Sequence, residues 1–329
     1  MWDLRNVEDP DDPILGPCVR LISAYYQEIL GPTQRPYPEE ELAWRLRPVA
    51  GRRWHRLVVA LDRELVVGVA LQTVPWDAGP TSYLRIVMVH PELRRRGIAR
   101  SLLDRAASAA SDEGRVRLGW QLPYGGPGTT AFAAAQGAEL LGVFEQNRVA
   151  TSALDRSTLE TWVESARDAA RNYELIGWDG PCPDEHLEAF ASMQALMEDA
   201  PGNRPEDAVA RTIDRLRQRE AFDLGRGPNW RVCVRHIGSG TLVGYTELQP
   251  LVTRPWLANQ GDTVVAPIHR GNGLGRWMKA RNALRILDEQ PEVDVIETAN
   301  DETNGPMLEI NRAMGFVPVC RWVQWSRAL

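Results

Sequence analysis

Two short stretches of this sequence combine arginine and glycine in the same pattern. Residues 94–99 read Arg-Arg-Arg-Gly-Ile-Ala and residues 270–275 read Arg-Gly-Asn-Gly-Leu-Gly. In each case a β-branched run precedes the stretch and a helical pattern follows it. A strand, a glycine loop and a helix start together form an anion cradle, because glycine lets the backbone approach closely and the first N–H groups of a helix are free. The chemistry indicated is phosphate binding, to which arginine adds charge and bidentate donors.

The two stretches belong to a longer internal repeat. Arg94 and Arg270 are 176 positions apart (270 − 94). The same offset pairs residues of two expected strands and of the loop, namely Trp54 with Trp230, Val67 with Val243, Gly68 with Gly244, Pro91 with Pro267 and Gly97 with Gly273. One register held over this length indicates a duplicated domain. We expect an N-terminal domain over 1–155 and a C-terminal domain over 156–329.

Other phosphate-binding loops fit the pattern less well. A Rossmann loop needs Gly-x-Gly-x-x-Gly with an acidic residue about twenty positions later, and residues 271–275 do not keep that spacing. A P-loop needs Gly-Lys-Ser/Thr, which neither copy has. A plain glycine-rich turn explains one copy but explains two copies in register poorly.

Hydrophobic periodicity predicts a similar series of elements in both halves. In the first half it predicts helices at 19–30, 38–46, 98–111 and 129–136, and strands at 54–61, 65–72, 83–89, 116–122 and within 139–151. In the second half it predicts helices at 156–171, 184–198, 205–220, 274–288 and 306–314, and strands at 230–237, 241–248, 261–266, 293–298 and 317–326. Each half is therefore expected to be an α+β domain with a mixed, mostly antiparallel sheet flanked by helices.

Composition limits the class of protein. The chain has 329 residues, 43% of them hydrophobic and 25% charged, which is ordinary for a globular protein with two cores. A net charge of −6 argues against nucleic acid as the main partner, and no apolar run is long enough for a membrane span. The N-terminus has no signal-peptide pattern, so a cytoplasmic location is expected. The four cysteines have no metal-ligand spacing, and Lys279, the only lysine, is interpreted as codon bias of a GC-rich genome.

At this point the chain resembles the GNAT superfamily of acyl-CoA N-acyltransferases. The resemblance rests on the two loops and on the pattern at 300–316 that closes the second copy, and the first copy closes more loosely at 131–138. It covers roughly residues 50–150 and 225–329. It implies direct acyl transfer to an amine, with acetyl-CoA or another acyl-CoA as cosubstrate and no metal. The tandem layout is similar to that of two-domain members such as mycothiol synthase, which implies a catalytic C-terminal copy and a degenerate N-terminal one.

The resemblance also implies which residues bind coenzyme A. The strand before each loop would bind the pantetheine arm through its backbone, at Val87 and Val89 in one copy and at Thr263 and Val265 in the other. The loops would hold the pyrophosphate through Arg94, Arg95, Arg96, Gly97, Ile98 and Ala99, and through Arg270, Gly271, Asn272, Gly273, Leu274 and Gly275. Asn304 is expected either to contact the cofactor or to cap the last helix of the second copy.

The catalytic acid and base are harder to place. A tyrosine often stands four residues before the helix-end glycine in this family, and counting back from Gly315 gives Asn311. Asn311 can hydrogen-bond the sulfur or the pantetheine but cannot protonate the sulfur, so a water serves or the thiolate leaves unaided. The alternative role of Asn311 is that of a buried helix-cap partner. For the base we expect Glu247, on the second hairpin, then Asp262 or Glu297, and last His269. The alternative for each carboxylate is a solvated or salt-bridged side chain. The alternative for His269 is a position that flanks the phosphates.

Three functions compete at this stage. The first is an N-acetyltransferase acting on a small-molecule amine, as a monomer with an internal pseudo-dimer or as a homodimer. The second is a non-catalytic acyl-CoA-binding sensor, which the missing tyrosines favour, and the third is a protein N-acetyltransferase. Acceptor contacts are expected from 198–204 and from loops near Trp256, but the acceptor itself is not readable from the sequence.

Overall fold

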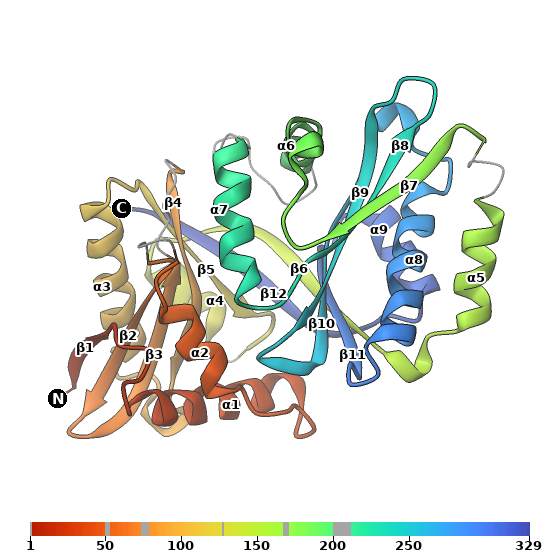
Figure 1. The fold of residues 1–329 in the computed structure, drawn as a ribbon. Helices are drawn as coiled ribbons and strands as arrows, with labels where there is room; N and C mark the ends of the chain where they lie inside the picture. The colour runs from red at the N-terminus through yellow and green to blue at the C-terminus, as the bar shows by residue number, and fades with distance from the viewer. Residues whose placement is uncertain (1, 50–52, 74–78, 127, 167–170, 200–211) are drawn as a thin grey trace. The chain divides into compact units, whose positions relative to one another are not determined.

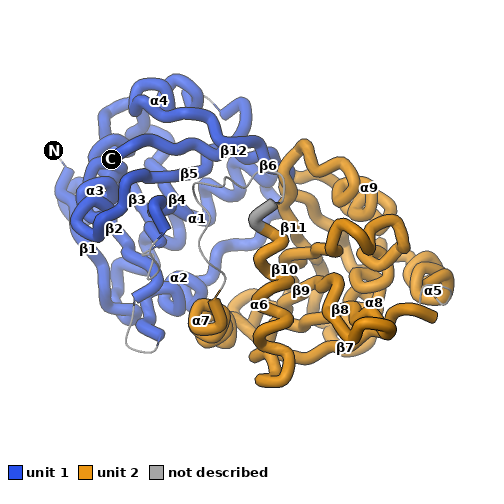
Figure 2. The backbone as a smooth tube through the Cα atoms, turned by 90° about the horizontal axis from the view of Figure 1, so that it is seen from above, with its two compact units in different colours: residues 1–145, 320–329 blue, residues 146–319 orange. Residues whose placement is uncertain are grey.

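The structure is a computed structural model that describes residues 2–49, 53–73, 79–126, 128–166, 171–199 and 212–329. The chain divides into two compact units, one of residues 1–145 with 320–329 and the other of residues 146–319 (Figure 2). These limits differ from the expected segments of 1–155 and 156–329. One limit falls within the strand at Glu139–Ala150 and the other within the strand at Val317–Ala328. The last ten residues of the chain belong to the N-terminal unit.

The N-terminal unit has a sheet in the order β1-β2-β3-β4-β5-β12. The strands are β1 (Asp3–Val7), β2 (His55–Asp62), β3 (Leu65–Thr73), β4 (Thr81–Val89), β5 (Arg117–Pro123) and β12 (Val317–Ala328). Helices α1 (Leu15–Leu30) and α2 (Glu39–Leu46) contribute to the core on one face, and α3 (Ile98–Asp112) and α4 (Thr129–Ala135) to the core on the other. Figure 1 shows this layered arrangement of helices on a sheet.

The C-terminal unit repeats the plan, with its strands in the order β6-β11-β10-β9-β8-β7. The strands are β6 (Glu139–Ala150), β7 (Tyr173–Asp179), β8 (Trp230–His236), β9 (Leu242–Leu251), β10 (Arg254–Val265) and β11 (Val295–Asp301). Helices α5 (Arg156–Ser165) and α8 (Leu274–Glu289) pack on one face, and α6 (Leu187–Ala195) and α7 (Ile213–Leu224) on the other (Figure 1). Helix α9 (Gly305–Ala313) follows β11, and the expected helix at 205–220 lies partly outside the described residues.

The last strands of the two halves are exchanged. Strand β12 ends the second copy in sequence but pairs antiparallel with β5, with Trp325 opposite Trp120. Strand β6 ends the first copy, and its residues from 146 onward belong to the C-terminal unit, where the Thr151 N–H donates to the Asp294 carbonyl that precedes β11. Each unit therefore completes its sheet with chain from the other half of the sequence.

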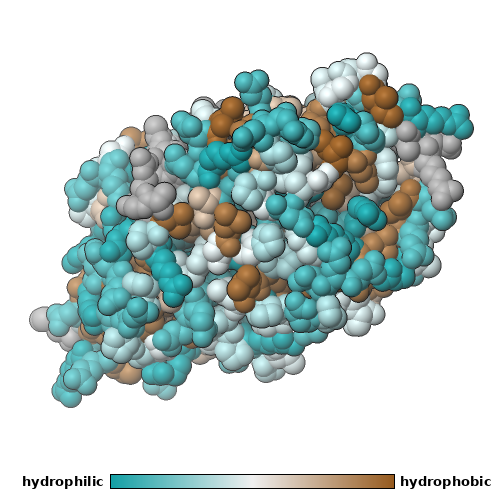
Figure 3. Space-filling model, in the orientation of Figure 1, coloured by the Kyte–Doolittle hydropathy of each residue, from teal (hydrophilic) through white to brown (hydrophobic). Residues whose placement is uncertain are grey.

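The α+β class and the mixed sheet are confirmed. Among the described strand pairs, β4 with β5 and β10 with β11 are parallel, and the other pairs with a recorded register are antiparallel. No helix within the described ranges is long and apolar enough to cross a membrane. On the face drawn in Figure 3, hydrophobic residues are scattered among hydrophilic ones.

Paired glycines bring each loop helix close to its sheet. A Cβ on Gly68 would lie 2.9 Å from Cγ2 of Ile98, at the start of α3. A Cβ on Gly244 would lie 2.9 Å from the Val264 carbonyl oxygen and 3.3 Å from Cε of Met278, on α8. The 2.9 Å separations are too short for a side chain, so Gly68 lets α3 pack closely on the sheet and Gly244 lets β10 approach β9, with Met278 of α8 in tight contact.

Candidate active site

The two loops have the same backbone conformation. Gly97 and Gly273, which precede α3 and α8, are left-handed with φ of 91° and 71°. Two residues earlier, Arg95 and Gly271 are also left-handed, with φ of 65° and 83°. The left-handed region costs a residue with a side chain about 1–2 kcal/mol. The N-terminal copy keeps the fold of the loop at Arg95 although it has lost the glycine that suits it.

The second loop leaves room for an anion. A Cβ on Gly271 or Gly273 would meet no atom within 4 Å among the described residues. In contrast, a Cβ on Gly97 would approach the Trp2 ring at 3.7 Å. The first intrahelical bond of α8 runs from the Trp277 N–H to the Gly273 carbonyl, so the N–H groups of 274–276 point out of the helix end without helical partners. These groups and the open glycines form the cradle expected of a pyrophosphate site.

The first arginine of each loop donates a hydrogen bond to the last carbonyl of the preceding strand. Nε of Arg94 donates to the Val89 carbonyl at 3.3 Å, and Nε of Arg270 donates to the Val265 carbonyl at 3.0 Å. The two guanidinium groups differ in their remaining contacts. Arg94 forms an ion pair with Glu28 of α1, whereas the Arg270 guanidinium has no carboxylate within 4 Å among the described residues.

The parallel strands separate just before the loops. Strand β10 pairs with β11 only from Leu257 to Asn259, and its pairing with β9 shifts register between Gln260 and Thr263. In the first copy β4 likewise leaves β5 after Leu84, and its register with β3 shifts there. A bulge of this kind bends the strand away from its neighbour. Each unit therefore has a strand edge that faces a gap in its sheet.

The residues expected to bind the pantetheine arm lie on this edge. The Ala266 N–H donates to Val243 of β9, so the preceding alternate residues, Val265 and Thr263, direct their backbone groups to the side where β11 has separated. The Val265 carbonyl accepts from Arg270 on that side. The same reasoning places the backbone groups of Val87 and Val89 on the open side of β4, because the His90 N–H donates to β3.

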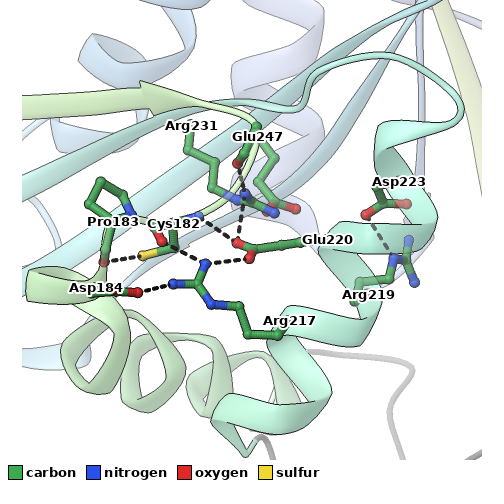
Figure 4. A network of polar contacts seen from close by, with 10 residues as sticks. Cys182, Pro183, Asp184, Arg217, Arg219, Glu220, Asp223, Arg231 and Glu247 are labelled. Atoms are coloured by element: carbon green, nitrogen blue, oxygen red, sulfur yellow. Dashed lines mark hydrogen bonds and ion pairs between the residues drawn. The ribbon is translucent and has the colours of Figure 1, made fainter. Parts of the chain in front are cut away.

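Glu247, the expected base, lies in a buried ionic network (Figure 4). Its Oε1 accepts from Nε of Arg231 at 2.8 Å, and Arg231 stands opposite Glu247 in the β8–β9 ladder. Its Oε2 would lie 3.4 Å from a Cβ on Gly261, in the bulge of β10. The carboxylate therefore reaches the bulged edge of the gap. Burial raises the pKa of Glu247, while the charge of Arg231 acts in the opposite direction.

The network continues to a second buried carboxylate that the sequence did not indicate. Glu220 of α7 accepts from Arg231 at 3.2 Å, from the Cys182 N–H at 2.7 Å and from Arg217 at 2.9 Å. Arg231 also donates to the Gly180 carbonyl at 2.5 Å and is almost fully buried. Figure 4 shows Arg231 between the carboxylates of Glu247 and Glu220. A cross-strand pairing of 231 with 247 was readable from the hairpin, but the contact with α7 was not.

The other base candidates have fixed partners. Asp262 accepts from the Tyr245 hydroxyl at 3.2 Å, and Glu297 accepts from Nε of Arg148 at 2.7 Å. Nδ1 of His269 lies 2.9 Å from the Tyr173 hydroxyl. Glu297 is thus a salt-bridged carboxylate, as the alternative interpretation held, and Asp262 stays at the bulge beside Glu247.

The two asparagines of the last helix have different surroundings. Asn304 is the N-cap of α9, where its Oδ1 accepts from the Met307 N–H at 3.4 Å. Asn311 is buried and donates from Nδ2 to Oδ1 of Asn300 at 2.7 Å. Its own Oδ1 has no hydrogen-bond partner among the described residues. The capping role of Asn304 is confirmed, while Asn311 has an acceptor available.

The cysteines do not resemble nucleophiles. All four have free thiols, and burial raises the pKa of Cys18 and of Cys182 to about 12. A thiol with such a pKa is protonated near neutral pH.

Part of the expected acceptor region, at 200–204, lies outside the described residues, as do the side chains at 198 and 199.

Comparison with known proteins connects this geometry to a family. Residues 19–137 match the family model described as the acetyltransferase (GNAT) family. A tandem GNAT protein from the clavulanic acid biosynthesis pathway is 29% identical, with a TM-score of 0.78 over 100% of this chain and 98% of that one. A GCN5-related N-acetyltransferase from Sphaerobacter thermophilus shares the fold at 16% identity, with a TM-score of 0.66 over 99% and 95% of the two chains. A search of curated protein sequences found no match.

Proposed function

Because this chain belongs to the GNAT superfamily and carries two of its domains in tandem, we propose that it transfers an acetyl group from acetyl-CoA directly to a small-molecule amine, in its C-terminal unit. The observation that carries this proposal is the second loop. Gly271 and Gly273 are open, the N–H groups at the start of α8 are free of helical partners, and the Arg270 guanidinium has no carboxylate partner in the described chain. The loop of the N-terminal unit lacks two of these features.

Several groups of the C-terminal unit suit the chemistry of acyl transfer. An ammonium substrate must lose a proton before its nitrogen can attack a thioester. Glu247 is a largely buried carboxylate beside the bulge of β10, and its raised pKa makes it a stronger proton acceptor. The open edge at Thr263 and Val265 provides backbone donors and acceptors for the pantetheine arm. A small-molecule acceptor is supported by the 29% identical relative, which is described as belonging to a biosynthetic pathway.

A non-catalytic acyl-CoA sensor is the second candidate. It is favoured by Asn311, which occupies the position where the family often has an acidic tyrosine, because an amide cannot protonate a leaving thiolate. Release of free thiol from saturating acetyl-CoA in the presence of a mixed amine library distinguishes the two. Thiol release above the rate without protein supports the transferase, and tight binding without release supports the sensor.

The choice of unit is tested with two matched glycine variants. Gly273→Glu places a negative side chain in the cradle of the second loop, and Gly97→Glu does the same in the first. Measured by calorimetry with acetyl-CoA and by thiol release, Gly273→Glu should weaken binding at least about tenfold and abolish turnover, because the added charge repels the diphosphate. Gly97→Glu should keep most of the turnover. The reverse pattern would assign catalysis to the N-terminal unit.

A further inference from the structure

Three polar side chains are buried in the C-terminal unit without adequate partners. Lys279, Asn282 and Asn311 are each only 1% exposed. Nζ of Lys279, both side-chain atoms of Asn282 and Oδ1 of Asn311 have no hydrogen-bond partner in the described part of the chain. Leaving a buried polar group unpaired costs roughly 1–3 kcal/mol. Together these groups leave several buried donors and acceptors available to a ligand or to buried water.

Lys279 and Asn282 lie on the side of α8 that faces α9, the helix that carries Asn311. Gly275 faces α9, since a Cβ on it would lie 3.6 Å from Cδ1 of Ile310. Lys279 is one turn later and therefore on the same side of α8, with its Nζ 5.8 Å from the centre of the Phe316 ring. Asn282 is three positions further along this side of the helix.

The backbone near Phe316 links this space to Asn311. The Phe316 N–H donates to the Asn311 carbonyl at 3.0 Å, so the residue that Lys279 contacts also contacts the end of α9. Helix α8 packs on β8, β9 and β10, and the Asn311 side chain of α9 donates to Asn300 of β11. The space between the two helices therefore lies over β10 and β11, whose pairing ends at Asn259.

The N-terminal unit shows that the fold does not need these polar groups. The offset of 176 places Leu103 and Ala106 at the positions of Lys279 and Asn282, and counting back four from Gly137 places Ala133 at that of Asn311. All three are fully buried members of one hydrophobic core cluster. The same helix pair packs with apolar side chains in one copy and with unpaired polar ones in the other.

A large ring also occupies this region in the N-terminal copy and has no equivalent in the second. Trp120 of β5 is fully buried in the cluster that contains Leu103 and Ala133. Trp120 pairs with Leu84 of β4. The recognised pairs of β10 and β11 end at Asn259 and Glu297, so the next residue of β11, Thr298, corresponds to Trp120. The Thr298 hydroxyl donates to the Gln260 carbonyl at 3.2 Å, at the start of the gap. A tryptophan in the first copy is thus replaced by a small polar residue in the second.

We propose that Lys279, Asn282 and Asn311 select the C-terminal unit as the one that takes the pantetheine arm of acyl-CoA, by supplying side-chain partners for the amides and hydroxyl of the arm. This inference rests on the proposed function of that unit. The arm would run from the diphosphate along β10, and α8 runs back over the sheet from the loop. About 9 Å of helix separates Gly273 from Lys279 at 1.5 Å per residue, so Lys279 and Asn282 would lie beside the arm and away from the diphosphate. An arm in this space would pair the groups that are unpaired in the free protein.

The proposal predicts opposite effects on stability and on binding. The double variant Lys279→Leu with Asn282→Ala installs the residues of the N-terminal copy. Its melting temperature should rise, because buried unpaired polar groups are removed. Its affinity for coenzyme A should fall at least about tenfold, whereas its affinity for 3′-phosphoadenosine 5′-diphosphate, which has no pantetheine arm, should stay within about twofold of that of the wild-type chain.

The matched control is Met278→Leu, which also installs a residue of the N-terminal copy, Leu102, but at a position that is apolar in both copies and contacts the sheet at Gly244. It should leave both affinities unchanged. If the double variant does not fold, Asn311→Ala is measured in its place. Unchanged coenzyme A affinity, as expected if only buried waters fill the space, overturns the inference. Equal loss for both ligands also overturns it. Failure of the wild-type chain to bind coenzyme A would instead contradict the proposed function.

Discussion

Glu28 holds the guanidinium of Arg94 through both of its carboxylate oxygens, at 2.8 and 2.5 Å. Arg94 belongs to the phosphate-type loop of the N-terminal unit, and its equivalent in the other unit, Arg270, has no such partner in the described chain. The hydrogen bond with Arg94 lowers the pKa of Glu28, so the carboxylate is ionised at neutral pH. The Glu28 carboxylate therefore already neutralises the guanidinium of Arg94, which would otherwise attract a phosphate.

Replacing Glu28 should improve anion binding by the N-terminal loop. Glu28→Gln keeps the size of the side chain and removes its charge. We expect coenzyme A affinity of the N-terminal unit to increase about three- to tenfold, since an exposed ion pair contributes about 0.2–1 kcal/mol and a nearby repulsive charge is also lost. Calorimetry in the Gly273→Glu background reports this unit alone. Glu160→Gln, on α5, is the charge-matched control, and equal affinities for the two variants would contradict the prediction.

A second prediction concerns Glu247 as proton acceptor. Glu247→Gln removes the base but retains a side-chain oxygen that can accept from Arg231. Turnover at pH 7 should fall about a hundredfold and recover as pH rises, because free amine then becomes abundant without the base. In the wild-type chain the rate should fall at acid pH, and the raised pKa of Glu247 moves this fall toward neutrality. Thiol release across this pH range measures both profiles.

The control for this prediction is Asp262→Asn, the neighbouring carboxylate at the bulge. It should lower turnover by less than Glu247→Gln and should not change the shape of the pH profile. Circular dichroism establishes that each variant is folded, because Glu247 also neutralises the buried Arg231. A Glu247→Gln variant with the wild-type rate at every pH would leave Asp262 or water as the acceptor.

Much of the fold was readable from the sequence because the repeat reported it twice. The two hairpins, both loops and the helices after them were predicted at nearly the observed limits, since alternating β-branched residues and left-handed glycines are local signals. The edge strands β1 and β7 were not predicted. Their sequences, Asp-Leu-Arg-Asn-Val and Tyr-Glu-Leu-Ile-Gly-Trp-Asp, have weak or interrupted strand patterns. The exchange of β6 and β12 was also missed, because a repeat offset does not say which copy a final strand joins.

The candidate site divides in the same way. The positions of the loop residues and of Thr263 and Val265 on one open strand edge follow from local pattern, and their role in binding stays a prediction. The ion pair of Glu247 with Arg231 and the contact with Glu220 depend on packing between distant segments. Lys279 was interpreted as codon usage, but the structure places it in the core. In the sequence, the available signal was its alignment with Leu103, which is a buried apolar residue in the first copy.

The buried amine of Lys279 gives the last prediction. Burial lowers the pKa of Lys279 from 10.5 to about 7. The folded chain therefore loses this proton near pH 7, whereas the unfolded chain keeps it until about pH 10.5. Between these values the unfolded state binds more protons, so the free energy of unfolding should increase with pH, by at most about 1.4 kcal/mol per pH unit from this group. Below about pH 7 both states are protonated and the full penalty is present.

The prediction is measured as a difference between matched variants. Lys279→Leu should be more stable than the wild-type chain at pH 7 in urea unfolding, and this advantage should shrink by roughly 2 kcal/mol between pH 7.5 and pH 9.5. Met278→Leu should show no such pH-dependent difference, since it does not titrate. The comparison cancels the titration of groups that the two chains share. A Lys279→Leu advantage that stays constant across this range would show that the lysine is charged in the folded chain, and that a partner outside the described residues stabilises its ammonium.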